Sequence, residues 1–102
     1  MALLNTRVEY APFEYQQAYR YWELQQQSHW LHHEIAMAGD IQDWKENLTE
    51  SEKNVIAGIL KGFTQAEILI EDYWSNKVCN WFKKPEIQMM GNTFAAFESI
   101  HA

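Results

Sequence analysis

The stretch Phe94-Ala95-Ala96-Phe97-Glu98-Ser99-Ile100-His101 decides the interpretation of this chain, because two polar side chains interrupt an apolar helical pattern. Apolar residues recur there at three- and four-residue spacing, as expected of one buried helix face: Ile87, Met90, Phe94 and Phe97. Glu98 and His101 fall along the same stripe. Helix residues three apart project from one face, so this pair can bind a common partner.

A second predicted helix carries another carboxylate on its apolar stripe. Glu67 lies at the centre of the stretch 63–70, and its helix has apolar residues at helical spacing: Ile56, Ile59, Leu60, Phe63, Ile70 and Trp74. Burying even a neutral polar group without a partner costs roughly 2–7 kcal/mol. Two core-facing carboxylates and an imidazole therefore predict a shared counter-charge, and a metal ion satisfies all three. One Glu plus one Glu-x-x-His is half of the ligand set of dimetal-carboxylate helical bundles.

The first half of the chain is expected to be less regular. Residues 1–12 read as an extended arm that ends in a turn, and residues 13–28 keep helical spacing without a breaker. Gly39-Asp40 predicts a turn, and residues 41–46 a short helical segment.

The second half is predicted to form two long antiparallel helices. Thr49-x-x-Glu52 is a capping box, which places a helix over residues 50–80. Gly58 and Gly62 weaken that helix but allow another helix to approach it. Lys83-Lys84-Pro85 ends it and begins a last helix over residues 85–102, since Pro is favoured at the first helical position. An all-α fold follows.

Composition limits the function classes. The 102 residues allow one domain, and the net charge of −6 argues against nucleic acid, which favours a basic face. The single cysteine, Cys79, excludes an internal disulfide and fits a reducing cytoplasm, where we expect a structural role for it. We expect no membrane span and no signal peptide. The 15% aromatic content predicts that much of the aromatic surface contacts a partner polypeptide.

From about Tyr10 onward the sequence resembles the N-terminal third of the small, radical-generating subunit of class I ribonucleotide reductase, a ferritin-like dimetal protein. Trp30, followed by Glu34 and Ile35, matches a family segment after the first helix. Glu67 matches the first carboxylate ligand, and Glu98-Ser99-Ile100-His101 matches the Glu-x-Ile-His that follows 31 residues later. His32 replaces a proline of many members, and Glu67 replaces the aspartate of the best-known ones.

The resemblance implies a ferritin-like helical bundle to which this N-terminal part contributes about three helices. It implies that Glu67, Glu98 and His101 bind dinuclear iron, a manganese–iron pair or dimanganese, and that Trp30 relays an electron. The implied activity is dioxygen activation for deoxyribonucleotide synthesis, in the cytoplasm. The implied partners are a large catalytic subunit and a second small subunit.

Several alternatives stay open. Two copies of the half-bundle could complete the site symmetrically, giving a metal-storage or ferroxidase protein. The polar residues could also pair with one another in a purely structural role. Trp30 could be a packing residue. His29, His32 and His33 could suggest a zinc site, but no cysteine or carboxylate cluster supports one, so we interpret them as surface or partner-contacting histidines.

The last expectation concerns completeness. The final helix reaches Ala102 without a stop signal, and three ligands on two helices leave a metal pair with open positions. We therefore expect a complementary C-terminal small-subunit polypeptide that supplies the remaining ligands. Without it, the protein is expected to fold poorly and to bind iron or manganese weakly.

Overall fold

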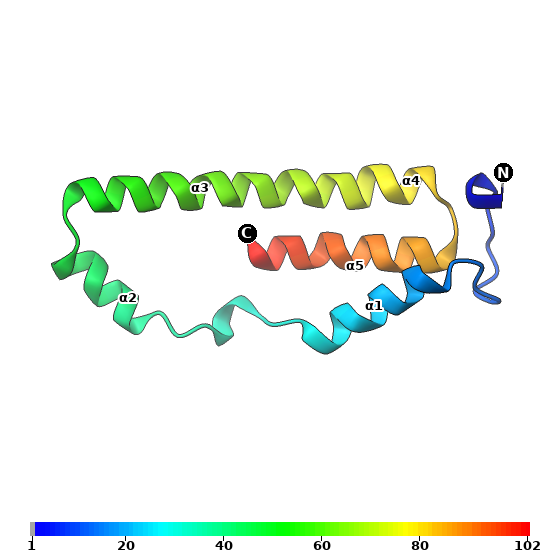
Figure 1. The fold of residues 1–102 in the computed structure, drawn as a ribbon, viewed down its shortest axis with the longest axis horizontal. Helices are drawn as coiled ribbons and strands as arrows, with labels where there is room; N and C mark the ends of the chain where they lie inside the picture. Colours follow the sequence, from blue (N-terminus) through cyan, green and yellow to red (C-terminus); the bar gives the residue numbers. More distant parts are fainter. Residues whose placement is uncertain (1) are drawn as a thin grey trace.

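The computed structural model describes residues 2–102, and every regular element among them is helical (Figure 1). In order along the sequence the elements are η1 (Ala2–Leu4), α1 (Gln16–Ser28), η2 (His32–Glu34), α2 (Ala38–Gln42), η3 (Asp43–Asn47), α3 (Glu50–Asp72), η4 (Tyr73–Val78), α4 (Cys79–Trp81) and α5 (Pro85–His101). The elements η1 and η2 are 3-10 turns, whereas η3 and η4 are π-helical. The predicted all-α fold is confirmed. Met1, the first residue of the predicted arm, lies outside the described residues.

The longest helix, α3, begins at the predicted capping box. The Thr49 hydroxyl accepts a hydrogen bond from the Glu52 N–H at 3.2 Å, and the Glu52 carboxylate accepts one from the Thr49 N–H at 2.9 Å. The helical conformation continues to Trp81, close to the predicted end at residue 80, but it is α-helical only as far as Asp72. The π-helical turns of η4 follow, and the sequence pattern did not predict them.

The helix α5 begins at Pro85, as predicted, and runs antiparallel to α3 (Figure 1). Its Gly91 allows close contact with the preceding segment, because a Cβ there would lie 2.7 Å from the Cys79 sulfur. Apart from the backbone of the same helix and the adjacent residues, nothing lies within 4 Å of a Cβ built at Gly58 or Gly62. The close helix approach that those two glycines predicted is therefore not made by any described part of this protein.

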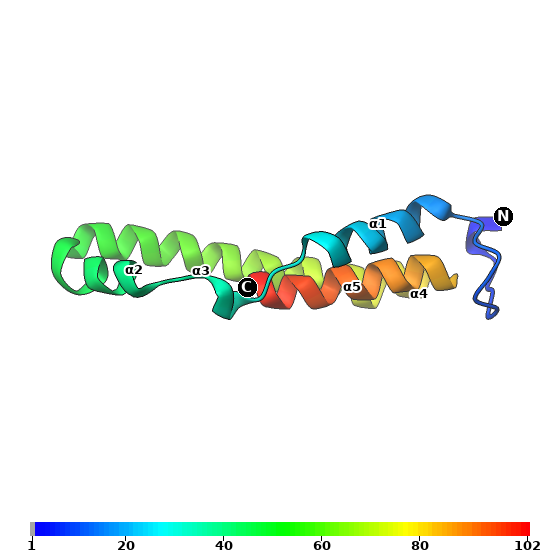
Figure 2. The same ribbon diagram turned by 90° about the horizontal axis from the view of Figure 1, so that it is seen from below.

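On its other side α5 packs along α1 (Figure 2). The predicted helix 13–28 begins three residues late, at Gln16, and ends at Ser28. A small core lies at this end of the molecule, where Ala18, Val78 and Ile87 are buried against one another. Partly buried side chains surround this core: Leu3, Tyr15, Trp74, Phe82 and Met90.

The N-terminal arm is fixed to this core by charges. The Arg7 guanidinium contacts the carboxylates of Glu14 and Glu86, and the Lys84 ammonium donates to Glu14 at 2.9 Å. Glu86 is fully buried and Lys84 is 2% exposed. Burial alone would raise the pKa of Glu86, but the hydrogen bond and charge of Arg7, together with hydrogen bonds from the backbone, outweigh it, so this pKa lies below its ordinary value. The pKa of Glu14 is also lowered, mainly by Lys84.

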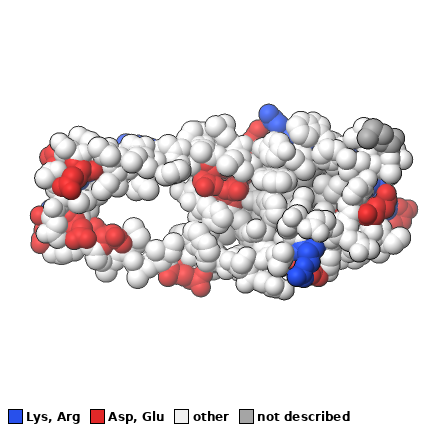
Figure 3. All heavy atoms as spheres, in the orientation of Figure 1, with Lys and Arg blue, Asp and Glu red and all other residues white. Residues whose placement is uncertain are grey.

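The opposite end of the molecule is open. Ile59, Leu60 and Phe63 were predicted to face a core, yet they are 53%, 58% and 64% exposed. The reason is that α5 covers only the second half of α3 (Figure 1). The space-filling view shows an opening between the first half of α3 and the segment that follows α1 (Figure 3).

The turn predicted at Gly39-Asp40 was wrong, since both residues belong to α2, whose backbone N–H groups continue the helical pattern into η3. No helix within residues 2–102 combines the length and the apolar character that crossing a membrane requires.

Candidate metal centre

Three side chains from α3 and α5 converge at the level of the last turn of α5. Glu67, Glu98 and His101 each offer one ligand atom, and these atoms all lie within 4.8 Å of one another. The structure thus brings together the three residues that the sequence selected. Among residues 2–102 no other group of three or more His, Cys, Asp or Glu side chains converges in this way.

The two helices position these side chains in different ways. Glu98 and His101 are one turn apart on α5, and the Glu98 Oε2 lies 3.8 Å from the His101 Nδ1. Glu67 reaches them from the antiparallel α3, and both carboxylate residues are half-buried. Two carboxylates and one imidazole suit iron or manganese, because these metals accept oxygen and nitrogen ligands together. The donor set therefore fits a metal ion, although three donors leave coordination positions for other groups.

Trp30 lies directly against this cluster. Its ring stacks on the His101 imidazole, with 5.0 Å between the centroids and 19° between the planes. The neighbouring His29 stacks on Phe97, one turn before His101 on α5, at a centroid distance of 5.3 Å. These two stacks hold the segment between α1 and η2 against the end of α5.

The other histidines lie apart from the cluster. His32 and His33 contact each other edge to face in η2, with 5.7 Å between their centroids, and both are exposed. Neither belongs to the convergent group. The prediction that they occupy the surface is confirmed.

Sequence reasoning missed two hydrogen bonds that join the ligand-bearing helices. The Ser99 hydroxyl donates to the Glu71 carboxylate at 2.9 Å, and the Thr64 hydroxyl donates to the Ala102 carbonyl at 3.1 Å. Glu71 follows Glu67 by one helical turn, and Ser99 directly follows Glu98. The sequence therefore shows a hydroxyl and a carboxylate close to the ligands, but their contact can be recognised only once α3 and α5 are paired.

A family comparison agrees with this arrangement. Residues 7–102 match the family model described as ribonucleotide reductase, small chain. The protein belongs to this family.

Individual relatives support the assignment to this family. The protein is 35% identical over 101 residues to a probable ribonucleoside-diphosphate reductase small subunit of Invertebrate iridescent virus 6. It is 33% identical over 99 residues to a similar protein of Invertebrate iridescent virus 3, and 28% identical over 98 residues to a ribonucleoside-diphosphate reductase small chain of Arabidopsis thaliana. The matches cover 99%, 97% and 96% of this sequence but only 28%, 26% and 28% of those proteins. It thus spans about a quarter of the length of its curated relatives.

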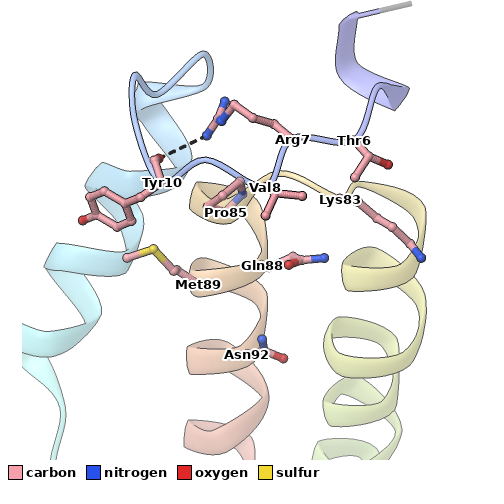
Figure 4. Close-up of a pocket in the computed structure, with 9 residues that line it drawn as sticks. All are labelled: Thr6, Arg7, Val8, Tyr10, Lys83, Pro85, Gln88, Met89 and Asn92. Atoms are coloured by element: carbon pink, nitrogen blue, oxygen red, sulfur yellow. Dashed lines mark hydrogen bonds between the residues drawn. The ribbon is translucent and has the colours of Figure 1, made fainter.

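A pocket of about 500 Å³ lies away from the convergent residues, beside the N-terminal arm (Figure 4). Arg7 and Lys83 border it on one side, and Gln88 and Asn92 of α5 on the other. Arg7 is engaged with the carbonyl of Tyr10 and with two carboxylates. The pocket is part of the arm's attachment and shares no residue with the metal-binding candidates.

Proposed function

We propose that this protein supplies half of the ligands of a dimetal-carboxylate centre in the small subunit of a class I ribonucleotide reductase. The observation that carries the proposal is the convergence of Glu67, Glu98 and His101 within 4.8 Å, on two helices of a family member. Each ligand would come from a regular helix, which fixes its direction better than a loop would. The relatives' names, which describe reductase small subunits, agree with this role.

The metals we propose are iron or manganese, as two irons, a manganese–iron pair or two manganese ions. Carboxylates hold such hard ions, and an imidazole adds a nitrogen ligand that alkaline-earth sites rarely use. When bound, the metal pair would supply dioxygen activation and the oxidising equivalent that the catalytic subunit uses to make deoxyribonucleotides. The side chains of this protein would bind and orient the metals.

Trp30 is proposed as the electron relay of this site. Its stacking on His101 gives direct contact between an oxidisable ring and a ligand. Phe at this position keeps a stacking ring but is much harder to oxidise. We expect Trp30→Phe to bind metal normally and to lose radical generation, whereas the control Trp44→Phe, on η3, retains it. Normal radical generation in Trp30→Phe would show that Trp30 is a packing residue and not the electron relay.

The remaining ligands are proposed to come from further helices, supplied by a complementary C-terminal small-subunit polypeptide. The open end of the molecule supports this proposal, because Ile59, Leu60 and Phe63 expose an apolar stripe on α3, the helix that carries Glu67. A radius of gyration of 18.6 Å also exceeds the roughly 13 Å of a compact domain of this length. We further propose that the assembled small subunit pairs with a second small subunit and with the large catalytic subunit, in the cytoplasm.

The test uses this polypeptide co-expressed with a segment that carries a second Glu and a second Glu-x-x-His, hereafter the assembled protein. We expect two metal ions per site by elemental analysis, and loss of the pair in Glu67→Ala and in Glu98→Ala. Glu46→Ala, an exposed carboxylate of η3, is the matched control. Two metals per site in either ligand variant would refute the assignment. Tight binding of two metals by the isolated polypeptide, as a symmetric dimer, would favour the metal-storage alternative.

A further inference from the structure

The hydrogen bond between Ser99 and Glu71 joins the two helices that carry the metal-binding candidates. The Ser99 Oγ donates to the Glu71 Oε2 at 2.9 Å. Ser99 is adjacent to Glu98 on α5, and Glu71 lies one turn beyond Glu67 on α3. The bond therefore spans the helix pair within one turn of the ligands themselves.

A second hydrogen bond lies on the other side of the cluster. The Thr64 Oγ1 donates to the Ala102 carbonyl at 3.1 Å, and Thr64 precedes Glu67 by three residues. Along the antiparallel pair, Glu67 and His101 lie between these two polar links, and Glu98 directly precedes Ser99. Of these two links, only the one from Ser99 joins side chain to side chain.

Apolar packing between α3 and α5 does not by itself fix the position of α5 relative to α3 at this level. The aromatic contact of Trp74 with Phe94, 4.8 Å between centroids, lies one helical turn before Glu98. Beyond it Ile70 is 42% exposed, and Ser99 and His101 are exposed. Successive side chains of an α-helix point about 100° apart. A rotation of α5 about its axis by a fraction of this angle would therefore turn Glu98 away from Glu67.

Repulsion between two carboxylates opposes the convergence of the ligands. Glu67 and Glu98 bring two carboxylates together, and before metal binds they repel each other, which favours separation of the helices. A hydroxyl that donates to a carboxylate forms a charge-assisted hydrogen bond, which is stronger than a neutral one. It can oppose this separation and also keeps the Glu71 carboxylate directed toward Ser99, outside the convergent group.

We infer that Ser99 and Glu71 are positioning residues that hold α3 and α5 at the separation and rotation required for Glu67, Glu98 and His101 to share a metal ion. The inference rests on the proposed metal-binding function. Neither residue is itself proposed as a ligand. Removing a group that hydrogen-bonds to a metal ligand typically changes metal affinity by about 10- to 100-fold, and Ser99 and Glu71 act one contact further out, so we expect the lower end of this range.

The test measures Mn²⁺ binding to the assembled protein by titration calorimetry and by electron paramagnetic resonance. We expect Ser99→Ala to weaken Mn²⁺ binding about 10-fold and to change the Mn²⁺ spectrum. Ser99→Thr keeps the hydroxyl and is expected to restore both. Alanine is a better helix former than serine, so Ser99→Ala is not expected to unfold α5.

Ser75→Ala is the matched control, because Ser75 also donates its hydroxyl to Glu71, but to the backbone carbonyl within the same helical segment. It is expected to leave Mn²⁺ affinity unchanged. Combining Ser99→Ala with Glu71→Ala should cost no more affinity than the larger single change, because both remove the same interaction. Additive losses would overturn the inference.

The remaining outcomes separate this inference from the proposed function. Mn²⁺ binding that depends on Glu67 but is unaffected by Ser99→Ala supports the function and overturns the positioning role. A lower melting temperature of metal-free Ser99→Ala, with unchanged affinity, also overturns it, because a purely structural bond would behave in that way. If the wild-type assembly binds no Mn²⁺, or if Glu67→Ala leaves binding intact, both proposals fail.

Discussion

The two ends of this molecule are built in opposite ways. At the end formed by α1, η4 and the first half of α5, apolar side chains are buried and four charged residues form a connected network. At the end formed by α2, η3 and the first half of α3, large apolar side chains lie in solvent. The apolar residues of α3 and of α5 both recur at three- and four-residue spacing, so the difference comes from what covers each helix.

The candidate metal cluster lies between these two ends. The packed end fixes where α5 begins, and the open end provides the surface on which further helices could pack. Glu67, Glu98 and His101 are therefore placed by contacts within this polypeptide but are only partly enclosed. The difference between the ends separates the part that packs within this polypeptide from the part whose packing would depend on assembly.

The largest expected effect tests this separation with a matched pair of isoleucines. Ile87 is 6% exposed at the packed end and Ile59 is 53% exposed at the open end. Ile87→Ala should lower the opening free energy of α5 by about 3 kcal/mol, because it removes buried apolar volume and leaves a cavity. Ile59→Ala should change the opening of α3 by less than about 0.5 kcal/mol in the isolated polypeptide. Hydrogen exchange of backbone amides measures both.

Assembly should remove this contrast. If a partner covers the first half of α3, Ile59→Ala should cost about 2 kcal/mol in the assembled protein. Equal, small effects of Ile59→Ala in the isolated and assembled forms would show that the open end stays in solvent.

A smaller effect is expected from a matched pair of glycines, and its sign should differ between the ends. A Cβ at Gly91 would lie 2.7 Å from the Cys79 sulfur, whereas one at Gly62 meets nothing within 4 Å. Gly91→Ala should destabilise by about 1 kcal/mol net, because overpacking exceeds the gain in helix propensity. Gly62→Ala should stabilise by about 0.5 kcal/mol. Thermal melts give both values, and stabilisation by Gly91→Ala would contradict the close packing.

The smallest expected effect is a loss of folding stability that is absent at neutral pH and develops in acid. The pKa values of Glu14 and Glu86 lie below the ordinary 4.5 in the folded protein, so below about pH 4.5 the unfolded state binds more protons. Stability should therefore fall as the pH falls from about 4.5 through the folded values. Melting temperatures between pH 7 and pH 3 should show this loss at the packed end. Glu86→Gln should flatten the dependence, whereas Glu46→Gln at the open end should not.

Sequence patterns predicted the helices and the three convergent residues because both depend on local spacing. The capping box at Thr49 and the proline at position 85 each fix a helix start through contacts that span only a few residues. The pairing of Glu98 with His101 follows from a single helical turn. The convergence of Glu67 with this pair needed the antiparallel arrangement, for which the family resemblance supplied the expectation.

Other features could not be predicted because they depend on contacts between distant residues. Gly91, rather than Gly58 or Gly62, permits the close approach, and only the position of the Cys79 sulfur reveals this. The apolar stripe of α3 predicted burial, but a stripe does not say whether the covering helix belongs to the same polypeptide. The aspartate that follows Gly39 favours a turn locally, yet both residues are helical in the structure.

The attachment of the N-terminal arm sets an order of events during synthesis. Arg7 contacts Glu86 across a sequence separation of 79 residues, and its backbone N–H donates to the Lys83 carbonyl at 3.0 Å. Closing a loop of that length costs about 4 kcal/mol in conformational entropy, before any constant term. The arm therefore leaves the ribosome before α5 and can dock only after α5 has begun to form and has presented its charges. Until then Arg7 and Glu14 stay in water, and the end that later becomes the most tightly packed remains as open as the other.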